Sequence, residues 1–565
     1  MLLNRREVLR HTLSLASTVY VSTALTGCVS SGAQASLDEA DFTHGVASGD
    51  PEPDALMLWT RAVPRAGERV RIAWEVAEDA NFERTLRSGI TTTSSDRDYT
   101  IKVDVRDLVQ GRDYYYRFRS ADSVSTTGKA RTLPTDAIDE LHLAVFSCSN
   151  YPAGYFHAYA EAAGLSHIDA FLHLGDYFYE YGAGGYATER AEELGRSLAS
   201  NNSGELLTLE DYRRRYALYR SDKDLQALHA AAPMIAVWDD HEIANDTWKR
   251  GAENHSDEEG DFEQRRTAAI QAYFEWMPLR PVIPDAEGRI YRSFAFGDLV
   301  DLHMLDTRLV GRDRQLNYRD FVDRETGILD NETFLSELSS PTRSLLGEPQ
   351  RDWLYGSLQA SSAKWQVLGQ QVLMARMTMP TTLLEKLFQD RDFNRTRPTI
   401  ERLVRAKAAM LQGADLSPQA AASVKQVLPY NLDAWDGYPA EREQLYAVAR
   451  RLKKSLVVLA GDTHNAWYSE LRDRWGQPVG VELGASSVSS PGMESYLGLA
   501  NEDQSETLAR ALTTLIDELQ YCELRRRGFL EVTFTREAVT ARWHFMDSVT
   551  ETSYGVEKRE LRARV

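Results

Sequence analysis

Side chains that bind metal ions or carry out catalysis stand at the ends of six apolar runs in the sequence. Thiolate, phenolate, imidazole and carboxylate groups are among the ligands that proteins offer to metal ions. Such groups gather at the carboxyl ends of strands in open α/β sheets, so six ends together predict one metal centre. The runs end in SCSN (147–150), GDYFY (175–179), WDDHE (238–242), LDTR (305–308), VLGQQ (367–371) and GDTH (461–464).

The elements that must position these residues are short strands alternating with helices. Most of the runs are continuously apolar rather than alternating, as expected for strands buried on both faces. Helical patterns such as residues 155–163 lie between them, which predicts an α/β sandwich over residues 140–565. Residues 183–232 and 375–440 are expected to form loop-and-helix insertions that wall a cleft. The runs span residues 141–150, 170–176, 234–242, 300–308, 365–371 and 456–464.

The two ends of the chain have patterns of their own. Residues 41–135 alternate between apolar and polar positions and are punctuated by turn residues, which predicts an N-terminal β-sandwich domain. Its segment DLVQGRDYYYRF (107–118) resembles the end of a fibronectin-type or immunoglobulin-like domain, where a tyrosine braces a corner. Near the C-terminus we expect a helix over residues 505–527, containing an inert Cys522, and a closing hairpin over residues 529–547.

Residues 1–28 are typical of an export signal rather than of a folded segment. Arg5 and Arg6 precede a weakly apolar run from Leu13 to Leu25, which favours a twin-arginine signal over an ordinary secretory one. The signal ends in LTGC, which resembles a lipobox with Cys28 as the lipidated residue; an incidental cysteine at a cleavage site is the alternative. Residues 29–40 then form a flexible tether. We therefore expect export by the twin-arginine machinery to the periplasm or cell surface, with a lipid anchor on Cys28.

Composition excludes some classes of function. The 565-residue chain has a net charge of −19, which argues against an obligate nucleic-acid partner. The charge does not exclude a phosphate substrate, because bound cations reverse the sign of a local site. Only three cysteines occur, so neither a disulfide framework nor a CxxC zinc pattern is present.

Taken together, SCSN, LGDYFYEYG, VWDDHEIAND, LDTR and GDTHNAW resemble the PhoD-type alkaline phosphatases and phosphodiesterases of the metallophosphoesterase superfamily. The opening FTHGVASGDPEPDALMLWT (42–60) is also typical of that family, so the resemblance covers nearly the whole chain after the signal. It implies an α/β/β/α sandwich behind the β-domain, and a phosphoester hydrolase that carries Fe(3+) and Ca(2+).

Resemblance to the wider group, which includes purple acid phosphatases, implies two ligand sets that share Asp176. The first set offers thiolate, phenolate and imidazole, donors that suit a redox-capable metal such as iron(III). The second set is all oxygen, which suits calcium, manganese or magnesium. The first set is Cys148, Asp176, Tyr179 and His464, and the second is Asp176, Asp240, Gln370 and Asp462.

The same resemblance implies roles for residues beside the ligands. His241 would assist the leaving group, and Asn245 would be a further catalytic residue. Arg308 would hold a phosphoryl oxygen, with a salt bridge as an equal alternative, and Asn150 would bind substrate. Asp239 and Asp240 are neighbours on an expected strand and would face opposite ways, leaving Asp240 as the ligand.

The reaction expected from such a site is hydrolysis by a metal-activated hydroxide that attacks phosphorus in line. A diesterase activity, as in phospholipase D-like relatives, would use the same residues, and the two insertions would decide between them. A decayed hydrolase that serves as a surface-binding lipoprotein is a remote alternative. It is disfavoured because every strand end keeps a functional side chain.

Overall fold

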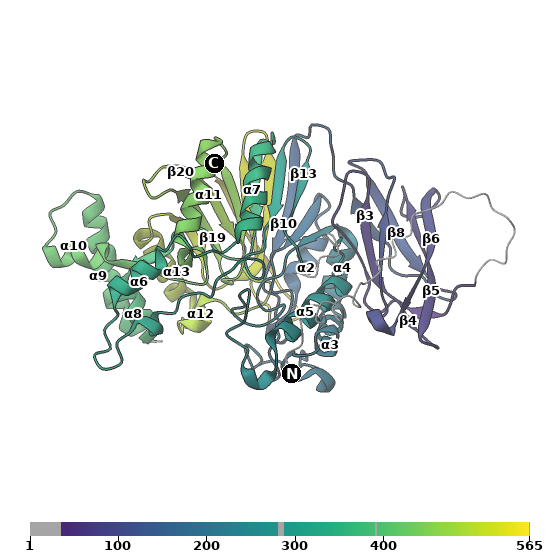
Figure 1. Cartoon of the computed structure of the whole chain (residues 1–565), viewed down its shortest axis with the longest axis horizontal. Helices are drawn as coiled ribbons and strands as arrows, with labels where there is room; N and C mark the ends of the chain where they lie inside the picture. The colour runs from purple at the N-terminus through teal and green to yellow at the C-terminus, as the bar shows by residue number, and fades with distance from the viewer. Residues whose placement is uncertain (1–35, 281–287, 390–391, 564–565) are drawn as a thin grey trace, which may run out of the picture.

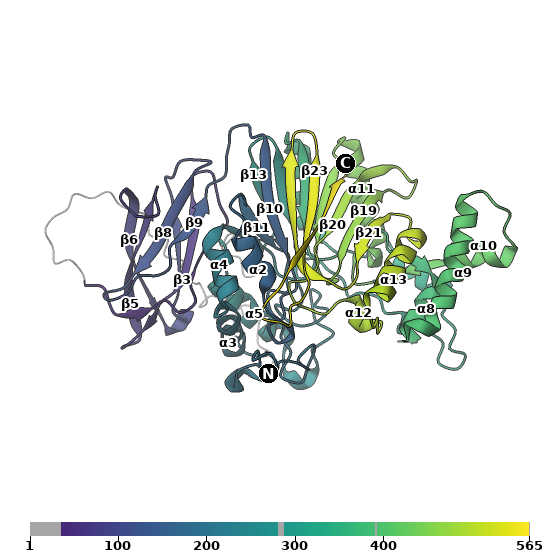
Figure 2. The same ribbon diagram turned by 180° about the vertical axis from the view of Figure 1, so that it is seen from behind.

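The structure is a computed structural model that describes residues 36–280, 288–389 and 392–563. The export signal, Cys28 and most of the tether lie outside the described residues. Figures 1 and 2 show a small β-domain at one end of the molecule, a layered α/β body in the middle and a helical insertion at the other end. Within the described residues, no helix combines the length and the apolarity needed to cross a membrane.

The N-terminal domain is a β-sandwich, as predicted. One sheet has the order β6-β5-β8-β9, and the facing layer is β2-β3-β7. Tyr114 braces the expected corner, because its hydroxyl donates to the carbonyl of Val109 at 3.1 Å and accepts from the Val109 amide at 2.8 Å. The strands are β2 (Val46–Gly49), β3 (Leu56–Arg61), β5 (Arg69–Ala77), β6 (Thr85–Ser94), β7 (Thr100–Val105), β8 (Asp113–Arg119) and β9 (Gly128–Arg131).

The first central sheet runs on from this domain. Its order is β24-β23-β22-β10-β11-β12-β2-β3-β7, and β2 joins β12 through the pair Met234 and Gly49. Strands β10, β11 and β12 are parallel, whereas β22 pairs antiparallel with β10. The body's strands are β10 (Glu140–Phe146), β11 (Ala170–His173), β12 (Met234–Ala236), β22 (Arg527–Thr535), β23 (Val539–Met546) and β24 (Val556–Ala563).

A second sheet packs against the first. Val457 and Leu459 of β18 belong to the core shared by the two sheets, whereas Leu456 and Val458 pack with helices on the other face. This two-sided burial explains why the run reads as continuously apolar, and it confirms the α/β/β/α sandwich. The order is β13 (Arg292–Phe296), β14 (Val300–Met304), β15 (Trp365–Gly369), β18 (Leu456–Ala460), β20 (Pro478–Gly484), β19 (Ala466–Arg472) and β21 (Leu519–Glu523).

Helices cover the outer faces of the two sheets (Figure 1). Next to the first sheet lie α2 (His157–Ala163), α3 (Leu209–Arg220), α4 (Lys223–Ala231) and α5 (Phe262–Trp276). Packed with the second are α7 (Glu348–Ala360), α11 (Pro439–Arg451) and α13 (Glu502–Leu515). The insertion over residues 375–440 contains β16 (Thr378–Pro380), α8 (Thr381–Gln389), α9 (Phe393–Leu411), α10 (Pro418–Lys425) and β17 (Val427–Pro429).

Two sequence-based expectations about elements were wrong. The helix expected over residues 505–527 ends at Leu515, and Cys522 lies on β21, where it pairs with Trp467 of β19. An open edge of β19 thus overrides the helical pattern of this segment. The expected strand over residues 234–242 ends at Ala236, so Asp239 and Asp240 lie in the turn beyond it.

Candidate metal centre

The strand ends of both sheets place their polar side chains in one region. Four of the predicted metal ligands sit in tight turns directly after strands, with positive φ: Cys148 (61°), Asp176 (53°), Asp462 (64°) and His464 (65°). This left-handed conformation is uncommon for residues other than glycine and costs on the order of 1–3 kcal/mol. Backbone strain of this kind is typical of functional sites, where the surrounding structure holds it in place.

The structure brings the four residues of the first predicted ligand set together. Ligand atoms of Cys148, Asp176 and His464 all lie within 4.8 Å of one another. The Tyr179 hydroxyl is 3.0 Å from His464 Nε2 and 3.3 Å from Asp176 Oδ2. His464 Nδ1 is 2.7 Å from the Pro491 carbonyl, which can only accept, so the Nε2 lone pair faces the other ligands.

A second group of carboxylates adjoins the first. Asp239, Asp240 and Asp462 lie within 4.8 Å of one another, and so do Asp176, Asp240 and His241. Asp176 belongs both to the group with Cys148 and His464 and to the group with Asp240 and His241, so it stands between the two sets of side chains. The expectation that Asp239 and Asp240 face opposite ways was wrong: both follow the end of β12, where a turn replaces the strand alternation.

The electrostatics of the region favour cations. Burial and neighbouring carboxylates raise the pKa values of Asp176 and Asp462 well above the usual range of an aspartate. The same causes raise the pKa of Asp239 to about 7. Burial, with Asp176 beside it, also raises the pKa of the Cys148 thiol. Asp176 Oδ1 and Asp239 Oδ2 are buried and have no hydrogen-bond partner among the described residues. Crowded anionic donors with free lone pairs fit metal ions, which would stabilise their charged forms.

Arg308 lies among these aspartates rather than at an exposed surface. Its side chain is fully buried, and Nε donates to Asp239 Oδ1. Its terminal nitrogens reach Asp433 at 2.9 Å and Asp462 at 3.1 Å, and NH2 is 3.5 Å from Asp240. All three guanidinium nitrogens face carboxylates, so the structure favours the salt-bridge alternative over direct binding of a phosphoryl group.

His241 is held at the edge of the site by a buried carboxylate. Its Nδ1 lies 2.7 Å from Glu180 Oε2, and Glu180 Oε1 accepts from the Asn245 amide, also at 2.7 Å. Burial lowers the pKa of His241, but the Glu180, Asp240 and Asp176 carboxylates raise it well above its usual range. The Asn245 side chain instead donates to Glu253 at 3.2 Å. Asn245 therefore contributes to the site through its backbone amide, which helps hold Glu180.

Asn150 and Gln370 differ in how well their amides are satisfied. Asn150 is 1% exposed, and neither atom of its side-chain amide has a hydrogen-bond partner in the part of the chain that the structure describes. Its backbone is pinned by Ser489, which accepts from the Asn150 amide and donates to its carbonyl, both at 2.8 Å. Gln370 instead donates to the Val372 carbonyl and accepts from Trp435 Nε1 at 2.8 Å. No described hydrogen bond joins Gln370 to the carboxylates.

Several positioning residues were not singled out from the sequence. The buried Glu242 accepts from the backbone amides of Asp176, Tyr177 and Asp239 at 3.0, 2.6 and 2.7 Å, and so ties two turns together. The Ser490 hydroxyl lies 2.7 Å from the Tyr179 oxygen and 3.0 Å from the Cys148 carbonyl. Glu242 lies within the WDDHE motif, and this position was the only indication of its role in the sequence.

A two-sheet sandwich with buried thiol, imidazole and carboxylate groups gathered at its strand ends fits the metallophosphoesterase class that the motifs resemble. The model of the PhoD-like phosphatase family matches residues 143–543, and that of the PhoD-like phosphatase N-terminal domain matches residues 27–134. Alkaline phosphatase D of Bacillus subtilis (strain 168) is 32% identical over 532 residues, covering 92% of this chain and 80% of the relative. A solved structure titled "Structure of PhoD" superposes with a TM-score of 0.72 at 30% identity, covering 93% of this chain and 90% of the other.

The chain therefore belongs to the PhoD-like phosphatase family, as its motifs predicted. It is a phosphoric ester hydrolase.

Proposed function

We propose that this protein is an exported alkaline phosphatase that hydrolyses phosphoesters at an iron and calcium centre. Iron(III) would be held by Cys148, Asp176, Tyr179 and His464. Calcium would be held by Asp176, Asp240 and Asp462, as the sequence predicted, and by Asp239 in place of the predicted Gln370, whose amide oxygen accepts from Trp435. The observation that carries the proposal is the convergence of thiol, carboxylate and imidazole ligands within 4.8 Å, with the Tyr179 phenol against them. Phenolate favours iron(III), and an all-carboxylate group favours calcium.

When bound, the metal ions would supply the Lewis acidity that activates water and neutralises charge on phosphorus-bound oxygens. The chain's own residues do the rest. Glu180 fixes the His241 ring at 2.7 Å, so that the imidazole can deliver a proton to the leaving oxygen. The buried amide of Asn150 is available to a phosphoryl oxygen. Arg308 balances the carboxylates and keeps Asp239, Asp240 and Asp462 in place.

Monoesters are the proposed substrates, and phosphodiesters are the alternative for the same site. Export by a twin-arginine signal and a lipid anchor on Cys28 complete the proposal. They rest on the sequence of residues 1–28 alone.

Metal analysis combined with a visible spectrum tests the centre. We expect iron and calcium in the purified protein, and colour from a phenolate-to-iron(III) charge-transfer band. Asp176→Ala, Cys148→Ala and His464→Ala should each abolish turnover. An active, colourless zinc protein would refute the metal assignment, and an Asp176→Ala variant with full activity and no metal would refute the hydrolase mechanism. Rates with a matched aryl phosphate monoester and diester decide the substrate class.

A further inference from the structure

A second cluster of metal-binding side chains lies away from the candidate metal centre. His142, His167 and Glu531 each offer a ligand atom, and these atoms all lie within 4.8 Å of one another. His142 stands near the start of β10, whereas Cys148 follows the end of the same strand. At about 3.3 Å per residue, the part of the strand from His142 to Phe146 alone spans roughly 13 Å. The cluster is therefore separate from the catalytic region.

The sheet register explains why the residues meet. On β10 and β22, His142 pairs with Thr533 and Ala144 pairs with Glu531, so His142 and Glu531 are diagonal neighbours on one face. His167 comes from the connection between α2 and β11. Its Nε2 lies 2.9 Å from Glu531 Oε1, and its ring meets that of His142 edge to face with centroids 4.8 Å apart.

Neighbouring groups orient these side chains as they do in known metal sites. Glu531 Oε2 lies 2.8 Å from His544 Nε2, and the carboxylate also accepts from Arg542 at 3.2 Å. His142 Nδ1 lies 3.1 Å from the Thr533 hydroxyl. Metal-binding histidines and carboxylates commonly have such outer hydrogen bonds, which fix the ring and the carboxylate in place.

Access to the cluster is also built in. The Glu531 side chain is 2% exposed, whereas that of His167 is 40% exposed. An ion could thus approach past His167 and reach a carboxylate that is shielded from solvent. Two imidazoles and one carboxylate leave a fourth position for water, which is the donor set of many tetrahedral zinc sites.

We propose that His142, His167 and Glu531 form a second metal site, which binds a divalent transition ion such as zinc. The donor set differs from both groups of the catalytic centre, one of which contains thiol and phenol and the other only carboxylates. Imidazole nitrogen selects zinc over calcium and magnesium, so the two regions discriminate between metals by ligand chemistry.

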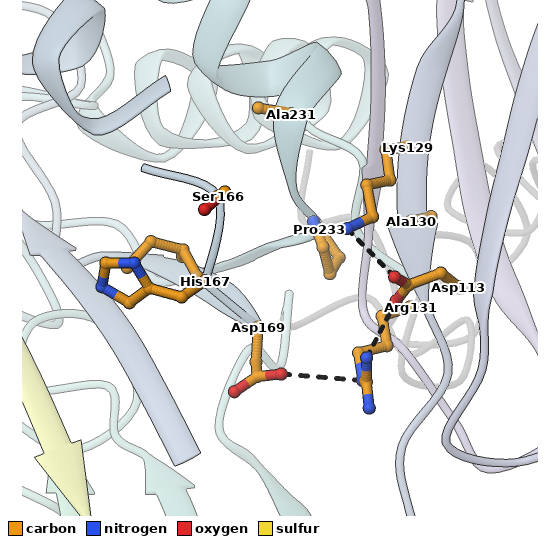
Figure 3. Close-up of a pocket in the computed structure, with 10 residues that line it drawn as sticks. Asp113, Lys129, Ala130, Arg131, Ser166, His167, Asp169, Ala231 and Pro233 are labelled. Carbon is orange, nitrogen blue, oxygen red and sulfur yellow. Dashed lines mark hydrogen bonds and ion pairs between the residues drawn. The ribbon is translucent and has the colours of Figure 1, made fainter. Parts of the chain in front are cut away.

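A metal at this site would hold in place the connection between α2 and β11, which also contacts the N-terminal domain. Asp169, two residues after His167, forms an ion pair with Arg131 of β9 at 3.6 Å. The same connection lines a cavity of about 120 Å³ together with Asp113 and Lys129 of the β-domain. Figure 3 shows Asp169 directed at Arg131, with the His167 ring on the other side of Asp169. A metal on His167 would therefore stabilise the docking of the two domains and leave the chemistry unchanged.

Zinc titration of the full purified chain, with metal analysis and thermal melts, tests the proposal. The wild-type protein should bind one more equivalent of zinc than His167→Ala or His142→Ala, and these two variants should lack the rise in Tm that the wild type shows on zinc addition. Thr533→Val, which removes an outer hydrogen bond, should weaken zinc binding by about tenfold.

His255→Ala is the matched control, because His255 also lies near a carboxylate, 3.8 Å from Glu259, but belongs to no cluster of possible metal ligands within the described residues. It should bind zinc like the wild type. Cobalt(II) gives an independent readout, since its visible absorption should appear in the wild type and be reduced in His167→Ala. Equal zinc content and equal Tm shifts in the wild type and His167→Ala would overturn the proposal.

Discussion

The Tyr179 hydroxyl lies 3.0 Å from His464 Nε2, although the two residues are 285 positions apart in the chain. Each follows a strand of a different sheet, β11 and β18, so the contact exists only because the two sheets pack face to face. Ser490 and Pro491 hold the two rings from one loop. The first ligand group can therefore form only when the two sheets of the sandwich pack together.

Tyr179→Phe tests the phenolate as an iron ligand. The fold should survive, because phenylalanine keeps the buried ring and loses only the hydroxyl. Iron affinity and turnover should fall by at least the roughly 10- to 100-fold that loss of an outer partner of a metal ligand costs. The charge-transfer band should disappear from the visible spectrum. If the variant keeps the wild-type colour, Tyr179 is not the source of the band.

Asn150→Ala tests substrate recognition by a side-chain amide that has no hydrogen-bond partner among the described residues. A hydrogen bond to a charged group contributes about 1.5–3 kcal/mol, so kcat/KM should fall roughly 10- to 150-fold. Stability and metal content should stay at wild-type values, because within the described part of the chain the Asn150 side chain makes no hydrogen bond that could be lost. Asn150→Asp should be worse, since it adds a negative charge beside a phosphate. Unchanged steady-state kinetics in both variants would exclude the role.

Arg308→Met tests the charge balance of the carboxylate group. Removing one partner of a buried ion pair costs about 3–5 kcal/mol, because it leaves uncompensated charge. The loss of unfolding free energy in chelator should be largely reversed by calcium, since a dication restores the balance for Asp239, Asp240 and Asp462.

Arg442→Met is the control for this prediction. Arg442 forms an equally buried pair with Asp436 at 2.6 Å, and Asp436 belongs to neither ligand group. Arg442→Met should be destabilised, and calcium should stabilise it only as much as it stabilises the wild type. Denaturant unfolding with and without calcium measures both variants, and equal calcium effects on the two would contradict the proposed role of Arg308.

Much of this fold and of the candidate centre could be predicted from the sequence, because the signals lie in short local stretches of it. Continuous apolar runs marked strands buried on both faces, and the residues that follow a parallel strand must meet at its carboxyl end. Cys148, Asp176 and His464 were found in this way. Glu242 was missed because its partners are backbone amides, which carry no signal in the side-chain sequence.

What the sequence did not predict depends on long-range packing. Asp433 reaches Arg308 from the insertion over residues 375–440, whose path cannot be derived from local patterns. Strand β24 is a charged edge strand, with exposed Lys558 and Arg559, so its pattern resembles that of a loop. The early end of the helix near Leu515 likewise reflects a pairing with β19 rather than a local stop signal.

Lys102 shows how the docking of the two domains affects stability. It lies on β7 of the N-terminal domain, and its Nζ donates to the Phe274 carbonyl of α5 at 2.9 Å. Burial lowers the pKa of Lys102 from 10.5 to about 7, with Asp50 opposing the shift and Arg280 adding to it. The folded state therefore binds this proton less tightly than the unfolded chain does.

The sign of the pH effect follows from that difference. Below pH 7 both states are protonated and the full cost of the buried charge is present; above about pH 10.5 both are neutral and the cost is gone. Lys102→Met should therefore raise the free energy of unfolding by on the order of 1–2 kcal/mol near pH 7, because Lys102 is only half-buried and the full shift in pKa is not realised as stability. The gain should shrink steadily as the pH rises toward 10.

Urea denaturation at several pH values checks this prediction, with Lys425→Met as the control because Lys425 is exposed on α10. The control should stay within about 0.5 kcal/mol of the wild type at every pH. If Lys102→Met is instead destabilised most at neutral pH, the bond to the Phe274 carbonyl outweighs the cost of burying the ammonium. The contact between β7 and α5 would then stabilise the domain interface rather than destabilise it.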